Sequence, residues 1–585
     1  ASFRGVLTNG GRGGGGGGGA LLRRSSSIRE LPRRFSRQLS RRRSSLAESL
    51  PDTPAGWAAS TAVLSSFALG YELRLQRSLT APPLVFSQSN PRNDALRETL
   101  SRRRPGGRKG ILTRDIKPSL WVGTRGTLSS AAAYALPHFG RKRRGECELN
   151  ARLNFREVMT MGRDGASVGI DWEVPPEKYD SSLCRRKTSE ERQSEILEGP
   201  IRKPVVLILH GINNDASFGY VRSLMRACTD RGWIAAGYNF RGCGGVPLTT
   251  PRGYTGSYTG DIRDAVQQIC DRTASPSVPV FLVGNSLGAN LITKYLGEEG
   301  YSGTLPPNVA GGVSLGNPLH IHSGNMSFPW AQVLGLGVRK SLFLTRDKWS
   351  QMTCRNFRAA FLKALLVCQT IGSVDDTLAP YLIRNDPVYP FAVTVGYPDA
   401  GEQYWDDASS YKYVQHVSVP LLKVTAQDDF LVYGSSLRKM SHCLECPNVT
   451  VVKTRCGGHL GWQESPPEEQ REGEGRGFGT SSWADAAAAD FIEAIIESRR
   501  KSDKEEEAIK KAREEEVEAE VAAARRRRKE EEREGGGRGD DDDDDDAGNA
   551  HMERRSTSER EGYIAARVAA AAAARREADE IRSRL

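Results

Sequence analysis

The feature that most constrains the fold of this chain is a short serine-containing turn at residues 284–288 (GNSLG). Residues 278–283 precede it as an apolar run rich in β-branched side chains, which predicts a buried strand. Residues 287–297 follow with apolar side chains at helical spacing. Strand, G-x-S-x-G and helix together predict a nucleophile elbow, with Ser286 on a strained turn. The two glycines are needed because strand and helix leave no room for a Cβ atom.

The pentapeptide alone is weak evidence, because the chain contains the same pattern three times. Residues 165–169 (GASVG) lie between two strand-like runs with no helix behind them, which favours a hairpin. Residues 312–316 (GVSLG) are followed by Asn317 and Pro318, which block a helix start there. Only Ser286 has both flanking elements, so it is the candidate nucleophile.

Composition limits the other interpretations. The 585 residues could hold two or more domains, but the hydrophobic fraction is only 38% and the shortfall lies at the ends. The net charge of +11 comes from a basic head and a tail of mixed sign, so no nucleic-acid surface is expected. Ten scattered cysteines, several in apolar runs, favour a reduced intracellular protein. Cys443 and Cys446 form a single CxxC without zinc-type spacing, and we expect no metal and no cofactor.

Residues 1–110 are predicted to be a targeting or disordered region. The first fifty residues carry eleven Arg, no Lys, two acids and seven consecutive glycines, so they cannot form a core. This composition resembles a plastid or mitochondrial transit peptide, and a disordered basic tail explains it equally well. The chain begins at Ala1, which leaves its natural start open.

Residues 53–71 are uncharged, which suits a membrane span in length. Five Ser or Thr side chains make the stretch only mildly apolar, so an interfacial or docked helix is favoured over a span. Residues 90–109 contain Arg and Pro and are predicted to be a linker.

Residues 111–499 are predicted to form one domain around a parallel sheet. A β-hairpin with an Asp-Gly turn is expected over residues 154–172, and a long polar loop over residues 175–203. Further strands are predicted at residues 205–209, 233–239, 308–315, 420–426 and 448–454, and helices at 217–231, 261–270 and 483–497. Strands separated by helices predict an α/β fold, with a mostly parallel sheet and helices on both faces. Residues 317–410 lack strand alternation and are predicted to form a helical cap over the serine.

Two late strands end in further candidate site residues. Asp428 and Asp429 follow the strand at residues 420–426, and His459 lies in a Gly-rich loop after the strand at 448–454. Parallel sheets place their chemistry at this edge. Serine, acid and histidine in this chain order are typical of a hydrolase triad, in which histidine takes the serine proton and the carboxylate fixes its tautomer. Only one aspartate can face the histidine, because neighbouring side chains in extended backbone point to opposite sides.

The candidate oxyanion hole consists of two backbone N–H groups. Leu287 directly follows the nucleophile, and Ile212 lies in the loop after the strand at residues 205–209. The side chain of His210 in that loop is expected to be structural. His210 and Asp215 also form an H-x4-D pattern found in some acyltransferases, which we treat as coincidence because it straddles the oxyanion loop.

The motifs together resemble the YheT-like, embryogenesis-associated branch of the α/β-hydrolases over about residues 120–497. The resemblance rests on residues 119–121 (SLW), 165–172 (GASVGIDW), 210–211 (HG), 239–245 (NFRGCGG), 284–290 (GNSLGAN), 316–318 (GNP), 426–429 (AQDD) and 457–462 (GGHLGW). It implies an α/β-hydrolase fold with Ser286 as nucleophile, Asp429 as acid and His459 as base. Asp428 would then accept hydrogen bonds from loop N–H groups. The chain departs from the family in the insertion at residues 175–203, in Phe430 where proline is common, and in its long ends.

The resemblance also implies a function. Family members are esterases or lipases that act on acylglycerols, medium-chain acyl esters or phospholipids, and many carry an N-terminal membrane anchor. We therefore expect a serine hydrolase of lipid esters with an acyl-enzyme on Ser286. An acyltransferase with the same triad and a non-catalytic scaffold are the alternatives. The expected partners are the lipid substrate and a membrane surface, with the protein membrane-associated or organellar inside the cell.

Residues 500–585 are predicted to be a charged low-complexity tail. Glu506 with Lys510, and Glu507 with Lys511, stand at i,i+4 spacing and support a solvated helix. Residues 535–537 (GGG) and seven aspartates at 540–546 end it, and the aspartates are expected to form a disordered acidic spacer.

Overall fold

The computed structural model describes residues 54–102, 109–135, 153–176, 187–322, 324, 326, 328–352, 356–384, 400–431, 438–465 and 481–534. The predictions for the basic head at residues 1–50 and for the aspartates at 540–546 lie outside the described residues. The chain divides into two compact units, residues 1–71 and 72–585. The described part of the first unit belongs to helix α2 (Pro54–Leu79), within which the division falls. In the described residues, no helix combines the length and apolar character that a membrane crossing requires.

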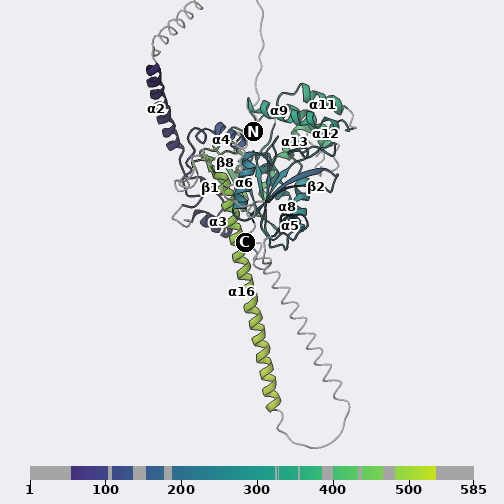
Figure 1. Ribbon diagram of the computed structural model, residues 1–585. Coiled ribbons are helices and arrows are strands. Elements are labelled where there is room, and N and C mark those ends of the chain that lie inside the picture. The colour runs from purple at the N-terminus through teal and green to yellow at the C-terminus, as the bar shows by residue number, and fades with distance from the viewer. Residues whose placement is uncertain are drawn as a thin grey trace, which may run out of the picture. The chain divides into compact units, whose positions relative to one another are not determined.

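A nine-stranded sheet organises the second unit, in the order β1-β9-β8-β7-β6-β4-β5-β3-β2 (Figure 1). Its parallel strands are β4 (Val205–Leu209), β5 (Ile234–Asn239), β6 (Val280–Asn285), β7 (Val309–Leu315), β8 (Leu421–Ala426) and β9 (Val449–Thr454). Nearly every residue of these strands is buried, because helices cover both faces. This is why they are continuous apolar runs in the sequence, and why their predicted positions agree with the observed ones to within two residues.

The predicted hairpin is also present. β2 (Leu153–Thr160) and β3 (Ser167–Val174) pair antiparallel, and β3 continues the sheet by pairing with β5. Gly165 in the turn has a φ of 68°, which favours glycine. Residues 165–169 therefore belong to a hairpin, and Ser314 of the third pentapeptide is buried within β7.

Helices cover both faces of the sheet, as predicted. Helix α7 (Gly260–Asp271) and helix α8 (Leu287–Ser302) contribute to one apolar core. The other face is covered by α6 (Gly219–Asp230), α4 (Gly126–Ala135) and the first turns of α16 (Trp483–Glu534). Beyond residue 497, α16 is almost entirely exposed and carries i,i+4 ion pairs such as Lys510 with Glu514.

A helical cap lies between β7 and β8, where the predicted alternation of strands and helices stops. It contains α9 (Trp330–Leu344), α10 (Arg346–Trp349), α11 (Phe357–Leu366), α12 (Ile371–Arg384) and α13 (Ala400–Ala408) (Figure 1). The cap has its own apolar core, in which Trp349, Phe357 and Phe361 pack together. The structure thus has the predicted α/β fold with a helical cap.

Two stretches predicted to lack regular structure are partly ordered. In the predicted linker, α3 (Pro91–Ser101) buries Leu96 and Leu100 in the core beside α16. Just before it, β1 (Leu84–Phe86) pairs antiparallel with β9 at the sheet edge. In the predicted loop, α5 (Ser189–Leu197) begins at a capping box. The linker and loop predictions were wrong there, because these short polar elements are stabilised mainly by tertiary contacts.

We expect Leu96→Ala and Leu100→Ala each to lower the free energy of unfolding by roughly 2–4 kcal/mol, because each leaves a cavity against α16. Urea unfolding followed by tryptophan fluorescence measures this change. Arg97→Ala, on the exposed side of the same helix, is the control and should change little. Unchanged stability in both leucine variants would mean that residues 91–101 behave as a linker after all.

Candidate active site

Ser286 stands between β6 and α8 in a backbone conformation that side chains other than glycine rarely adopt, with φ 54° and ψ −113°. Glycines on either side make the turn sterically possible. A Cβ atom at Gly284 would clash with the backbone of α8, and one at Gly288 would lie 2.6 Å from the His210 carbonyl oxygen. The Ser286 N–H donates to the Leu315 oxygen of β7 at 2.9 Å. The strained turn predicted from the motif is present.

The structure brings Ser286, His459 and Asp429 together in one hydrogen-bonded chain. The His459 Nδ1 lies 2.9 Å from Asp429 Oδ2 and 3.1 Å from Oδ1. Because an ionised carboxylate can only accept, Nδ1 carries the proton and Nε2 is left to accept from the Ser286 hydroxyl at 2.8 Å. Asp429 and His459 are buried, which strengthens both hydrogen bonds.

The two adjacent aspartates face different partners. Asp429 contacts the histidine and also accepts from the Leu431 N–H at 2.9 Å. Asp428 points away and accepts from the Gly458 N–H at 2.8 Å, at the base of the histidine loop. This division matches the prediction that loop N–H groups bind Asp428. Phe430, which follows the pair, packs against Trp330 of the cap with ring centroids 4.3 Å apart.

Helix α4 supports the loop that carries His459. The His459 N–H donates to the Ser130 hydroxyl at 2.7 Å, and the Gln463 N–H donates to the Ser129 hydroxyl at 3.2 Å. Gly458 and Leu460 have φ values of 60° and 70°, so the backbone turns sharply on both sides of the histidine. The imidazole is therefore positioned by its loop as well as by Asp429.

In the loop after β4, the backbone N–H groups on either side of Ile212 have hydrogen-bond partners, whereas that of Ile212 has none among the described residues. The Gly211 N–H donates to the Tyr220 hydroxyl at 2.9 Å, and the Asn213 N–H donates to the Tyr254 hydroxyl at 3.2 Å. The Ile212 N–H between them donates to no group in the described part of the chain, and nor does the Leu287 N–H at the start of α8. Both predicted oxyanion donors are therefore available to a bound oxygen atom.

His210, in the same loop, has a structural environment. The Phe240 N–H donates to its Nε2 at 3.4 Å, so Nδ1 carries the proton and donates to the Gly211 oxygen at 2.6 Å. Complete burial lowers the pKa of His210 to about 4, which keeps the ring neutral. The prediction of a structural histidine agrees with these contacts.

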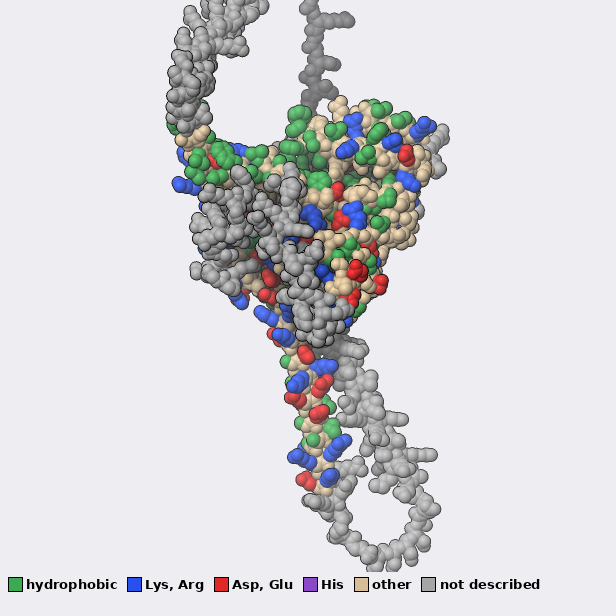
Figure 2. Space-filling view, in the orientation of Figure 1, with side chains coloured by type: hydrophobic (Ala, Val, Ile, Leu, Met, Phe, Trp, Pro, Cys, Tyr) green, Lys and Arg blue, Asp and Glu red, His purple; other side chains and the backbone are tan. Residues whose placement is uncertain are grey.

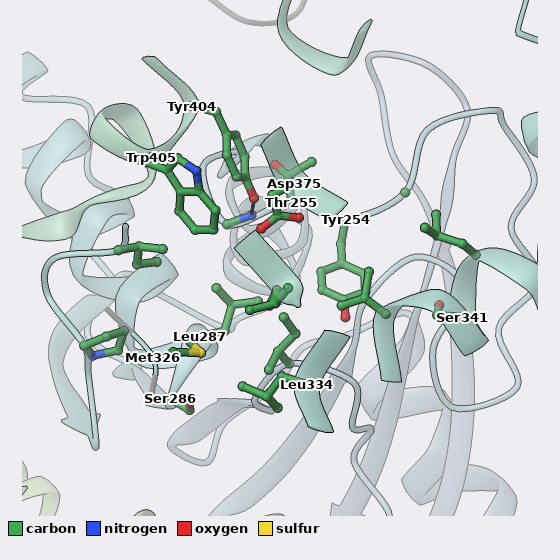
Figure 3. A pocket seen from close by; sticks show the side chains of 18 of the residues that line it. Tyr254, Thr255, Ser286, Leu287, Met326, Leu334, Ser341, Asp375, Tyr404 and Trp405 are labelled. Carbon is green, nitrogen blue, oxygen red and sulfur yellow. Dashed lines mark hydrogen bonds between the residues drawn. The ribbon is translucent and has the colours of Figure 1, made fainter. Parts of the chain in front are cut away.

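A cavity of about 150 Å³ opens beside Ser286, between the cap and the sheet edge (Figure 3). Its wall is mainly apolar and includes Ile212, Leu287, Leu334, Val338, Leu342 and Trp405. Figure 3 shows Leu287 and Met326 around Ser286, with Asp375, Thr255 and Tyr404 grouped on another side. A mostly apolar cleft with a few polar groups is typical of a site for a hydrophobic ligand.

Sequence reasoning missed several residues that position the site. Tyr254 and Tyr220 hold the loop around Ile212, and Ser130 holds the histidine loop. The only signal for Ser130 was a polar pair in an otherwise Ala-rich helix, and none of the three belongs to a motif. In the part of the chain that the structure describes, no three His, Cys, Asp or Glu side chains converge as metal ligands would.

Comparison with known proteins shows which family model the chain matches. Residues 204–466 match the family model described as "alpha/beta hydrolase fold". Over these residues the chain has the α/β-hydrolase fold. The residues of the turn, the histidine loop and the aspartate pair all lie inside the matched region, whereas α4 lies outside it.

Three proteins similar to this chain illustrate the range of names among its relatives. The embryogenesis-associated protein EMB8 of Picea glauca is 28% identical, over 58% of this chain and 66% of the relative. The monoacylglycerol lipase of Saccharomyces cerevisiae is 28% identical, over 48% and 60%. The phospholipase ABHD3 of Bos taurus is 24% identical, over 59% and 73%. The chain therefore spans less than two thirds of the first two relatives' length. The predicted resemblance to the embryogenesis-associated branch is confirmed.

Proposed function

We propose that this protein is a serine hydrolase that cleaves carboxylic esters of lipids through an acyl-enzyme on Ser286. The observation that carries the proposal is the chain of hydrogen bonds from Ser286 through His459 to Asp429, beside an apolar cavity. A serine hydroxyl is a poor nucleophile by itself and needs a base within hydrogen-bond reach, which His459 supplies at 2.8 Å.

In the first half of the reaction, Ser286 Oγ bonds to the ester carbonyl carbon while its proton moves to His459 Nε2. The carbonyl oxygen takes up the negative charge and accepts hydrogen bonds from the N–H groups of Ile212 and Leu287. The tetrahedral intermediate then collapses. The bond to the alcohol oxygen breaks, and the leaving alcohol takes the proton from His459.

In the second half, water gives a proton to His459 Nε2 while its oxygen attacks the acyl carbon. Ser286 leaves with that proton, and the carboxylic acid is released. Asp429 keeps the imidazole in the tautomer that both halves require. An alcohol in place of the water would transfer the acyl group instead, so product analysis with added glycerol separates hydrolysis from acyl transfer.

The substrate class is supported by the cavity and by the relatives' names. Apolar side chains from both the cap and the body line the cavity, which suits an acyl chain. The names monoacylglycerol lipase and phospholipase suggest glycerol esters of fatty acids as the first compounds to test.

Ser286→Ala should abolish labelling by a fluorophosphonate probe and lower the hydrolysis of p-nitrophenyl esters by roughly 10⁴–10⁶. Gel fluorescence and a spectrophotometric assay measure the two effects. Ser314→Ala is the matched control, because Ser314 has the same G-x-S-x-G surroundings but is buried in β7. Full labelling of the Ser286→Ala protein, or loss of labelling only in Ser314→Ala, would contradict the proposal.

Asp429→Asn should lower kcat by roughly 10³–10⁴ with little change in KM, because the amide would hold the wrong histidine tautomer. Asp428→Asn should lower kcat about tenfold or less, since its carboxyl accepts from the Gly458 N–H in the loop that carries His459. Steady-state kinetics on one p-nitrophenyl ester give both values. The reverse ranking would show that Asp428 is the functional acid.

We also propose that the protein associates with a membrane surface. Leu64 and Phe67 of α2 are exposed apolar side chains in the segment predicted to contact membranes. On the cap, Leu336 and Phe343 of α9 are exposed, and Lys340 lies between them in the sequence. Figure 2 shows hydrophobic side chains and Lys or Arg over the cap helices together. Exposed apolar side chains next to a lysine suit binding to an anionic lipid surface.

Plastid or mitochondrial targeting by the basic head stays a prediction.

Phe67→Glu and Phe343→Glu should each reduce flotation of the full-length protein with vesicles of phosphatidylcholine and phosphatidylserine, because each places a charge where an apolar side chain would enter the lipid. Gln351→Glu, an exposed cap position, adds the same charge without removing apolar surface and should float like the parent. If the parent does not float, membrane association is excluded under these conditions. If the parent floats but neither variant falls below the control, Phe67 and Phe343 are not the side chains that enter the lipid.

A further inference from the structure

An acidic side chain stands in the wall of the otherwise apolar cavity. Asp375 lies on α12, one turn after Ile371, and both residues line the cavity beside Ser286. Figure 3 shows Asp375 close to Thr255 and Tyr404, on the side of the cavity formed by the cap. Asp375 is the one acidic residue among the described residues that line this cavity.

The position of Asp375 is fixed by its helix. The N-terminus of α12 is closed by mutual hydrogen bonds between Thr370 and Ser373. The next residue, Asp376, accepts from the Trp405 indole N–H at 2.8 Å and ties α12 to α13. Gly335 lets α9 approach so closely that an added Cβ would lie 2.7 Å from the Thr370 backbone. The carboxyl of Asp375 is therefore held at the cavity on a rigid support.

The carboxyl of Asp375 has no hydrogen-bond partner within the described ranges, unlike that of Asp376. Burial, with a smaller contribution from the Asp376 charge, raises the pKa of Asp375 to about 8. At neutral pH the group is mostly a neutral acid, which can both donate and accept. The side chain of Asp375 is half-buried and stands at the cavity beside Ser286, so the missing partner can be supplied by a molecule bound there.

None of the charged or titratable groups that line the cavity forms an ion pair with Asp375 in the described part of the chain. They are Tyr254, Tyr404, Arg241, His320, His322 and His459. Arg241 is already paired with Asp164 at 2.6 Å and with Asp261 at 2.5 Å. His459 is paired with Asp429. Burial lowers the pKa of His320 and raises that of the Tyr254 phenol, so neither carries a charge at neutral pH.

We propose that Asp375 is a specificity-determining residue that binds a hydroxyl group of the ester substrate inside the cavity. The inference rests on the proposed esterase function and adds the chemical class of the substrate. A hydroxyl both donates and accepts, as does a protonated carboxyl, so one hydroxyl can satisfy Asp375 in both directions. The hydroxyl belongs either to the alcohol part of the ester, as in a monoacylglycerol, or to the acyl chain.

A site built for a hydroxyl discriminates against substrates that lack it, because the buried polar group is then left unpaired. For a single hydrogen bond to a neutral acid we expect a preference of roughly tenfold in kcat/KM. An ammonium group would instead require the ionised form of Asp375, which burial disfavours.

The test compares three esters of one chain length: glyceryl decanoate, methyl decanoate and methyl 10-hydroxydecanoate. The full-length parent should favour one of the hydroxyl-bearing esters over methyl decanoate about tenfold in kcat/KM. A preference for glyceryl decanoate places the hydroxyl in the alcohol part of the ester, and a preference for methyl 10-hydroxydecanoate places it in the acyl chain. Asp375→Leu should remove the preference, because it lowers kcat/KM for the favoured hydroxyl-bearing ester more than for methyl decanoate. Asp375→Asn should keep it, because the amide also donates and accepts.

A pH profile provides the second readout. In the parent, the preference should be full well below pH 8 and be lost as the pH rises through about 8, because Asp375 then loses the proton that it donates. Asp375→Asn should abolish that decline and leave the rise of kcat/KM at acidic pH where it is in the parent. Asp347→Leu, which removes an exposed acid from the same cap, should behave like the parent.

Fluorophosphonate labelling of Ser286 separates the two proposals. Absence of labelling in the parent would overturn the esterase proposal itself. Normal labelling of all variants, with no preference in the parent or with equal losses on all three esters in Asp375→Leu, would overturn the role of Asp375. Equal losses would mean that Asp375 only supports the cap.

Discussion

The close approach of β6 to the start of α8 is the constraint on which the rest of the site depends. Gly284 lets β6 approach the backbone of α8, Gly288 lets α8 approach the end of β4, and Ser286 is held between them in a strained conformation. The sheet order places β7 and then β8 and β9 beside β6. Because parallel strands end at one edge, the loops after β8 and β9 bring Asp429 and His459 towards the same serine.

That geometry needs support from a part of the chain that carries no recognised motif. The histidine loop changes direction at Gly458 and Leu460, and its backbone N–H groups bind Ser130 of α4 and the carboxyl of Asp428. These hydrogen bonds fix the backbone of the loop next to the imidazole. The α4 helix precedes the region that matches the hydrolase family, so the site depends on residues outside it.

The sequence predicts the parallel strands and the candidate site well for a physical reason. Strands buried on both faces are continuous apolar runs, and the turn at Ser286 has a distinctive glycine pattern. Residue alternation showed that only one of Asp428 and Asp429 could face the histidine, but choosing between them needed family resemblance. β1 and α3 escaped prediction because they are short and depend on packing against β9 and α16. The sequence did not indicate Asp375, because what makes this residue unusual is its position at an apolar cavity and not its neighbours in the sequence.

The cap and the oxyanion loop are mechanically joined, which links substrate selection to chemistry. The Asn213 side chain donates to the Leu334 oxygen of α9 at 3.0 Å, and Gly337 of the same helix leaves room for that amide. Asn213 directly follows Ile212, whose N–H points to no other described partner. A movement of α9 would therefore break the Asn213 bond and disturb the donor at Ile212. Because α9 also packs against the start of α12, the wall that carries Asp375 and the proposed oxyanion hole share one support.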